Sequence, residues 1–230
     1  MRRMFAVSLL ALGFAAAAQA EDPLHFQSQG ILGSIDIAAA QRGFLVYQSV
    51  CAACHSANAL HYRDLETLGF APDQVAGLLT GIKLSDGSAA TLDSSFKAPA
   101  PMALGGAVPP DLSSIVAQRP GGVRYVYRFL TGYATAPNGV DLLPGHYYNT
   151  AYPGGQTAMP PALRDNAVTY ADGTKATAQQ EAADVAEFLT WSADPNLSTR
   201  HIIGLRAVIF LVFLGIIAIV CKRRVWWEKA

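Results

Sequence analysis

Two cysteines and a histidine lie within five consecutive residues, in the segment CAACH at positions 51–55. Each thiol at this spacing can form a thioether with one vinyl group of a haem, and the imidazole that follows can ligate the iron. We therefore predict one covalently bound haem c, attached through Cys51 and Cys54, with His55 as the proximal ligand. A thioredoxin-like redox pair or half of a zinc site would use the same thiols. The only other cysteine, Cys221, lies in a long apolar run, so a four-ligand zinc site has too few thiols.

A six-coordinate electron-transfer haem needs a second axial ligand, and a methionine sulfur raises the potential relative to a second histidine. Beyond the first twenty residues the candidates are Met102 and Met159. Two prolines follow Met159, stiffen its loop and remove backbone donors, whereas Met102 lies in a Pro/Ala/Gly-rich stretch. We therefore predict Met159 as the sixth ligand. Filling the hydrophobic core is the other role open to both methionines.

A helix must position the two thiols. Asp36 is a suitable N-cap, and the residues after it predict a helix that leads into the CAACH segment. The apolar residues near one face of this helix are Ile37, Ala40, Phe44, Tyr47 and Cys51. Gly43 costs a helix about 1 kcal/mol relative to alanine, which is tolerable if another helix crosses closely at that point.

Three further helices are predicted in the body of the chain, over residues 72–79, over residues 123–130 and from a capping box at Thr177 to a stop at Asp194-Pro195. The face of the last helix that we expect to be buried holds Ala178, Ala182, Val185 and Leu189, with Phe188 and Trp191 at its margins. Residues 25–35 predict an irregular strap. Residues 81–110 are rich in Gly, Ser, Ala and Pro and predict a loop that wraps the core.

The first twenty residues predict an export signal. A basic start at Arg2 and Arg3 is followed by a short apolar stretch and by the small-x-small pattern at residues 18–20. A spanning helix is the alternative, but the stretch is shorter than the roughly 20 apolar residues that a bilayer requires. We expect cleavage after residue 20. Export of the chain agrees with the predicted haem, because covalent haem attachment occurs on the exported side of bacterial membranes.

Residues 202–221 are apolar except for Arg206, and about twenty helical residues reach across the roughly 30 Å of a bilayer. A buried core helix is the alternative reading of this run. Four basic residues and Trp226-Trp227 follow it, so by the positive-inside bias the tail is cytoplasmic. We predict an external domain at 21–200, a transmembrane anchor at 201–221 and a cytoplasmic tail at 222–230, in a bacterial inner membrane with the haem domain in the periplasm.

The external region is acidic. Residues 21–200 hold sixteen Asp and Glu against ten Lys and Arg, a formal charge of −6. This favours a basic partner and argues against a nucleic-acid partner, although a solvated acidic face without a partner remains open. The fold that we predict is mainly α, a class I c-type cytochrome-like haem domain with long loops, followed by one C-terminal transmembrane helix.

Several motifs together resemble a known family. They are QRG with VY and CAACHS in the first part, then YRDL, VPPDLSSIV with an arginine and paired glycines, YVYRFLTGY, YYNTAYPGG with AMPP, DGTKAT and DVAEFLTW, ahead of the single apolar run. The combination resembles cytochrome c1 of the cytochrome bc1 complex over nearly the whole chain after residue 20. One departure is Thr150, which follows Asn149 in the YYNTAYPGG motif, at a position where relatives have a proline.

The resemblance implies a role for further residues. It places the sixth haem ligand on Met159, approaches to the haem propionates on Arg119 and Tyr125, and a position against the haem on Pro110. It implies an electron relay from the Rieske iron-sulfur protein to a soluble or membrane-tethered cytochrome c, beside cytochrome b. No bond of a substrate is broken on such a chain, so it is not an enzyme by itself.

Two other functions compete with this one. A free-standing, membrane-anchored c-type cytochrome would carry electrons outside any quinol-oxidising complex. A haem sensor needs an open iron position, which ligation by Met159 would close.

Overall fold

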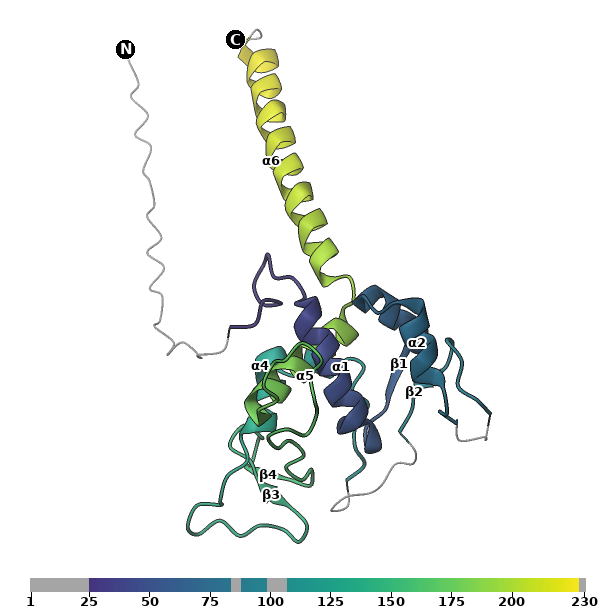
Figure 1. The fold of residues 1–230 in the computed structure, drawn as a ribbon. Helices are drawn as coiled ribbons and strands as arrows, with labels where there is room; N and C mark the ends of the chain where they lie inside the picture. The colour runs from purple at the N-terminus through teal and green to yellow at the C-terminus, as the bar shows by residue number, and fades with distance from the viewer. Residues whose placement is uncertain (1–24, 84–87, 99–106, 228–230) are drawn as a thin grey trace.

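The computed structural model describes residues 25–83, 88–98 and 107–227. Its elements in chain order are α1 (Ile37–Ser49), η1 (Cys51–Ala53), β1 (Ala57–His61), η2 (Tyr62–Leu68), α2 (Pro72–Leu79), β2 (Ser95–Phe96), α3 (Ile115–Gln118), α4 (Val123–Thr131), β3 (Tyr147–Tyr148), β4 (Gln156–Thr157), α5 (Ala178–Ala193) and α6 (Leu197–Trp227). Figure 1 shows a body built from α1 to α5, from which α6 projects as one long rod. The predicted export signal and Met102 lie outside the described ranges.

Helices α1 and α5 pack against each other and form the centre of the body. Both begin at the predicted caps, because Asp36 accepts a hydrogen bond from the Ala39 N–H at 3.0 Å and Thr177 accepts one from the Gln180 N–H at 3.2 Å. A Cβ atom on Gly43 would lie 2.0 Å from the carbonyl oxygen of Asp184. Only glycine permits so close a crossing, and this expectation from the sequence is confirmed.

Helix α5 is buried on nearly all sides. The prediction that Phe188 and Trp191 lie at the margins of its buried face is wrong, since their exposed fractions are 0% and 1%. The reason is that α1, α3 and α4 all pack against α5 and leave it almost no face toward solvent. A helix in this position cannot be recognised from one apolar stripe.

The buried carboxylates of α5 connect distant parts of the chain. Glu187 accepts hydrogen bonds from the Ser28 hydroxyl at 2.7 Å and from the Asp36 N–H at 3.0 Å. Asp184 accepts two from the Arg42 guanidinium, at 2.9 and 3.0 Å. Burial raises the pKa of Glu187, and the two hydrogen bonds partly offset that rise. These contacts fasten the strap and α1 to the central helix.

The segment predicted as loop, residues 81–110, contains a short strand among its described residues. Strand β2 pairs antiparallel with β1, and Phe96 of β2 is buried with its ring centroid 4.3 Å from that of Tyr62 and 5.9 Å from that of Phe44. A strand of two residues is too short to leave an alternating pattern in the sequence. The predicted helices at 72–79 and 123–130 are confirmed as α2 and α4.

Helix α6 extends over 31 residues and includes the whole apolar run. Its most apolar window of 18 residues has a mean hydropathy of 2.8, and none of that window is buried within the chain. It is therefore not a core helix of this body, and its length and composition suit a membrane span. The predicted mainly α fold with a C-terminal apolar helix is confirmed.

Candidate functional site

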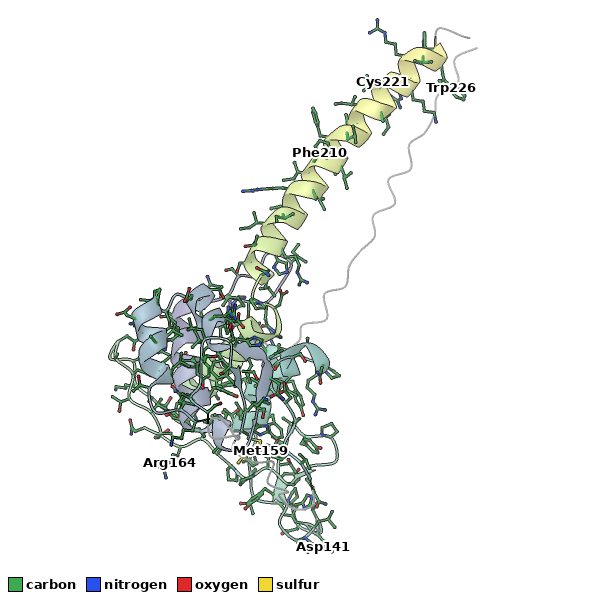
Figure 2. The ribbon with its side chains drawn as sticks, turned by 90° about the vertical axis from the view of Figure 1, so that its right-hand side faces the viewer. Asp141, Met159, Arg164, Phe210, Cys221 and Trp226 are labelled. Atoms are coloured by element: carbon green, nitrogen blue, oxygen red, sulfur yellow. The ribbon has the colours of Figure 1, made fainter. Side chains whose placement is uncertain are left out.

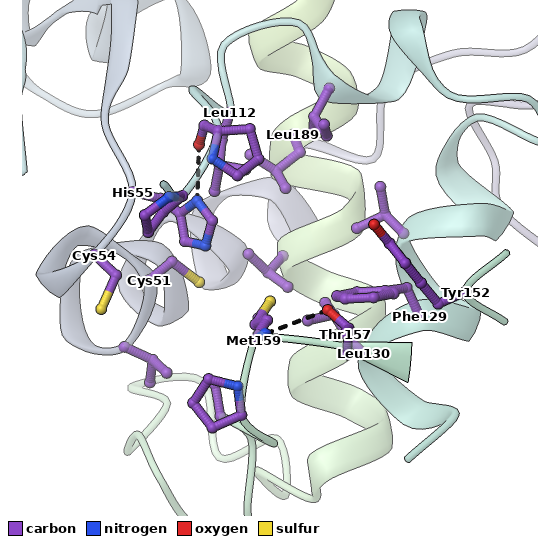
Figure 3. A pocket seen from close by; sticks show the side chains of 18 of the residues that line it. Cys51, Cys54, His55, Leu112, Phe129, Leu130, Tyr152, Thr157, Met159 and Leu189 are labelled. Atoms are coloured by element: carbon purple, nitrogen blue, oxygen red, sulfur yellow. Dashed lines mark hydrogen bonds between the residues drawn. The ribbon is translucent and has the colours of Figure 1, made fainter. Parts of the chain in front are cut away.

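A cavity of about 400 Å³ lies beside the end of α1 and is lined by parts of α4, α5 and the loop after β4 (Figure 3). The seven residues predicted to contact the haem all line it, namely Cys51, Cys54, His55, Pro110, Arg119, Tyr125 and Met159. Most of the other lining residues are apolar, among them Leu112, Phe129 and Leu189. Arg119 is the only Asp, Glu, Lys or Arg among the described residues that line this cavity.

The CAACH segment forms one wall. The N–H groups of Cys54 and His55 both donate to the carbonyl of Cys51, at 3.1 and 2.9 Å, and this tight turn places the two thiols and the imidazole side by side. The Tyr47 hydroxyl donates to the His55 carbonyl at 3.1 Å, which fixes the turn to α1. Burial raises the pKa of the Cys51 thiol to about 12, so this sulfur is a neutral thiol at neutral pH.

The imidazole of His55 is held in one tautomer. Its Nδ1 lies 2.8 Å from the carbonyl oxygen of Pro110, which can only accept, so Nδ1 carries the proton and donates. The lone pair of Nε2 is therefore free for a metal. The Pro110 segment is itself fixed, because Leu112 donates its N–H to the Ser56 carbonyl at 2.8 Å and Asp111 accepts from the Asn58 N–H at 2.8 Å.

Met159 belongs to the other wall. Its sulfur and the His55 imidazole point into the same space in Figure 3. The backbone of Met159 is held at both ends: its N–H donates to the Thr157 hydroxyl at 3.2 Å, and its carbonyl accepts from the Tyr133 hydroxyl at 3.0 Å. Pro160, the next residue, also lines the cavity.

The hairpin β3–β4 that carries this wall is tied to the end of α4. The buried amide of Asn149 donates to the Phe129 carbonyl at 2.8 Å. Thr150 donates both its N–H and its hydroxyl to the Gly132 carbonyl, at 2.9 and 3.1 Å. A proline, which has no N–H, could make neither bond, so the departure at Thr150 adds two contacts here.

Arg119 and Tyr125 lie together at the cavity. The guanidinium carbon of Arg119 is 6.0 Å from the centroid of the Tyr125 ring, within reach of a cation–π contact. Burial raises the pKa of the Tyr125 hydroxyl, and the charge of Arg119 partly opposes that rise. This corner combines a cation with a neutral hydroxyl donor, which is a suitable environment for carboxylates.

Sequence reasoning missed Tyr133 and Thr157, which position Met159 through its backbone. The hydroxyl of Tyr133 reaches a carbonyl 26 residues further along the chain. Nothing in the local pattern around YVYRFLTGY indicates that contact, because it depends on how the hairpin folds back onto α4.

The donor set of the cavity fits a haem. Covalent attachment requires two neighbouring thiols, and ligation of the iron requires the imidazole with its free Nε2 and the thioether. The apolar walls would exclude water, and the one cation would bind the propionates. A zinc centre fits less well, since the described residues contain no group of three or more His, Cys, Asp or Glu side chains that could hold a metal ion.

Comparison with known proteins agrees with this geometry. The family model described as "Cytochrome C1 family" matches residues 26–229. The chain belongs to the cytochrome c1 family. A relative from Solanum tuberosum, "Cytochrome c1-2, heme protein, mitochondrial", is 38% identical over 240 residues, which cover 94% of this chain and 92% of that protein.

Two further members of the cytochrome c1 family extend the comparison. "Cytochrome c1" of Rhodospirillum rubrum is 34% identical, with 98% of this chain and 97% of the relative covered. A Candida albicans relative, "Cytochrome b-c1 complex catalytic subunit, mitochondrial", is 36% identical, with 92% and 81% covered. The similarity therefore includes the body and α6 together.

Proposed function

We propose that this chain is the electron-transfer subunit of a cytochrome bc1 complex and passes one electron from the Rieske iron-sulfur protein to cytochrome c through a covalently bound haem c. One observation carries the proposal: two thiols, an imidazole with its Nε2 lone pair free and a methionine sulfur all face one apolar cavity. Membership of the cytochrome c1 family and the name of the Candida albicans relative support the assignment to such a complex.

A bound haem c would supply one-electron chemistry between ferric and ferrous iron. Cys51 and Cys54 would hold it by thioethers, and the His55 imidazole and the Met159 sulfur would ligate its iron. Pro110 keeps His55 in the tautomer that exposes Nε2, and Tyr133 keeps the Met159 backbone in place.

The walls and the cation of the cavity would complete the site. The apolar side chains would exclude water from a bound haem, which would favour its reduced state and raise its potential. Arg119 would compensate the charge of the propionates, with Tyr125 beside it. The chain itself moves no proton and breaks no bond in this scheme.

We further propose a single-pass topology. Helix α6 would anchor the protein in a bacterial inner membrane, with the haem domain in the periplasm and the tail from residue 222 in the cytoplasm. The length and apolarity of α6 and the basic residues after its apolar run support this orientation. Residues 1–20 would be removed on export.

Purification of the native complex tests the proposal. An affinity tag after Ala230 is used to isolate the protein from membranes in mild detergent. The expected product contains a cytochrome b with its haem spectrum and an iron-sulfur protein with its paramagnetic resonance signal, and it reduces cytochrome c when given a quinol.

A free-standing cytochrome would give another product. The tagged chain would then be isolated alone with its haem c, and the preparation would lack quinol oxidation. That result would contradict the assignment to a bc1 complex but would not contradict the proposed haem site.

A further inference from the structure

The strap before α1 carries two exposed apolar side chains. Ile31 is 89% exposed and Leu32 is 62% exposed, although they are adjacent. The ten residues from Phe26 to Ile35 contain no charged side chain. The strap turns sharply at Gly30, whose φ of +88° suits glycine, and so presents the Ile-Leu pair at its tip.

The strap is fixed along its length. At its base the Ser28 hydroxyl donates to Glu187 at 2.7 Å, and the Arg124 guanidinium donates to the Gln29 side chain at 2.8 Å. The Ser34 N–H closes the loop onto the Gln27 carbonyl at 3.0 Å. The exposure of the Ile-Leu pair is thus a property of a well-bonded loop and not of a frayed end.

The strap is also bonded to the base of α6. The His201 imidazole donates from Nδ1 to the Gly33 carbonyl at 2.7 Å, and the Ile35 N–H donates to the Ser198 hydroxyl at 3.0 Å. The apolar run of α6 starts directly after His201, at Ile202. Figure 1 shows the strap rising beside the first turns of α6.

The bonds to α6 determine how close the Ile31-Leu32 pair lies to the membrane surface. Leu32 and Ile31 are one and two residues from Gly33, whose carbonyl is bonded to His201 at the start of the proposed membrane span. Because consecutive Cα atoms are only about 3.8 Å apart, both residues lie close to the level of that start. If α6 crosses the bilayer, the pair lies at the boundary between headgroups and acyl chains. Exposed apolar side chains in a segment that carries no charged residue of its own are stabilised there by burial in lipid.

We propose that Ile31 and Leu32 insert into the outer face of the bilayer as a second, shallow membrane contact of the haem domain. The inference rests on the proposed insertion of α6. A single helix leaves the body free to tilt about it, and a second contact on the strap restricts that tilt. A protein partner is the less favoured occupant, because the patch offers neither aromatic rings nor arginines, the side chains that dominate protein interfaces.

Photo-crosslinking in the full chain tests the proposal. The amino acid p-benzoyl-phenylalanine replaces one residue at a time, at position 31, 32, 143 or 209, and the holoprotein is irradiated in native membranes. Position 209 in α6 is the positive control for the span. Position 143 is the matched surface control: Leu143 is 59% exposed in the loop that contains Asp141, which Figure 2 shows at the end of the body away from α6.

The expected result is a phospholipid adduct at positions 31, 32 and 209 and its absence at position 143, detected by mass spectrometry of the denatured chain. Protein adducts without lipid adducts at 31 and 32, or no adduct there, would overturn the proposal when position 209 reacts with lipid. Failure at position 209 as well would show that the membrane span, and with it the proposed topology, is wrong.

Discussion

The two walls of the cavity are built in different ways. Cys51, Cys54 and His55 are contiguous and follow directly from α1, which is packed on the buried α5. Met159 lies on a loop whose position depends on hydrogen bonds from Tyr133 and to Thr157. The first wall is therefore fixed by the core, whereas the second is fixed by a few polar contacts. We expect the second axial ligand to be the adjustable side of the site.

Removal of a thiol should have the largest effect, because it acts on the rigid wall. In Cys51→Ser or Cys54→Ser the haem should be attached by one thioether or lost, since each thiol supplies one bond. Haem-stained denaturing gels and pyridine haemochrome spectra measure this loss. Cys221→Ser, which changes the exposed thiol of α6, is the matched control and should keep normal haem. Normal covalent haem in Cys54→Ser would refute the attachment.

A methyl group at the helix crossing should disturb the support of the rigid wall. In Gly43→Ala the new Cβ meets the Asp184 backbone, so α1 and α5 must move apart, at a cost of about 1–3 kcal/mol in the free energy of unfolding. Gly77→Ala in α2 is the matched control, because a Cβ there meets nothing within 4 Å. It should be neutral or stabilising by up to about 1 kcal/mol.

Denaturant titration of the detergent-solubilised holoprotein, followed by the main haem absorption band, compares the two glycine variants. Equal midpoints for Gly43→Ala and the unmodified protein would show that the crossing does not control the rigid wall.

Loss of the hydroxyl of Tyr133 should have a smaller effect, confined to the adjustable wall. Tyr133→Phe removes one hydrogen bond to the Met159 carbonyl, worth about 1 kcal/mol or roughly fivefold in an equilibrium. External imidazole should then displace the methionine sulfur at about fivefold lower concentration. Tyr147→Phe, which removes a hydroxyl from strand β3 of the hairpin before Met159 and changes a side chain that is 41% exposed, is the control. Identical displacement curves for both variants would show that the Tyr133 hydroxyl does not hold Met159 in place.

Salt should have the smallest effect, since it acts on the outer face rather than on either wall. The formal charge of −6 over residues 21–200 should speed encounter with a basic cytochrome c. Exposed charges are screened within roughly 10 Å at 0.1 M salt, so the bimolecular rate should fall as ionic strength rises. Transfer from the iron-sulfur protein within the complex should respond less. A flat rate in stopped-flow oxidation would mean that docking is mainly apolar.

The difference between the walls also explains how far the sequence could predict the molecule. The Asp36 cap, the Thr177 cap and the glycine at the crossing were predicted because each leaves a local signal. The burial of Phe188 and Trp191 was not, because it depends on three other helices packing around α5.

The same division applies inside the cavity. CAACH is readable as five adjacent residues, and Met159 was distinguished by the prolines that follow it. The contacts of Pro110 with His55 and of Tyr133 with Met159 span 55 and 26 residues. Contacts at such separations are set by tertiary packing, and no spacing in a single sequence encodes them.

The central claim is that His55 and Met159 share one iron, and a redox titration of Met159→Leu tests it most directly. Axial ligands shift haem potentials over a range of about 0.8 V across proteins, so loss of the sulfur should lower the midpoint potential strongly. Met102→Leu is the matched control and should titrate like the unmodified protein. A normal potential in Met159→Leu together with a lowered one in Met102→Leu would contradict the account.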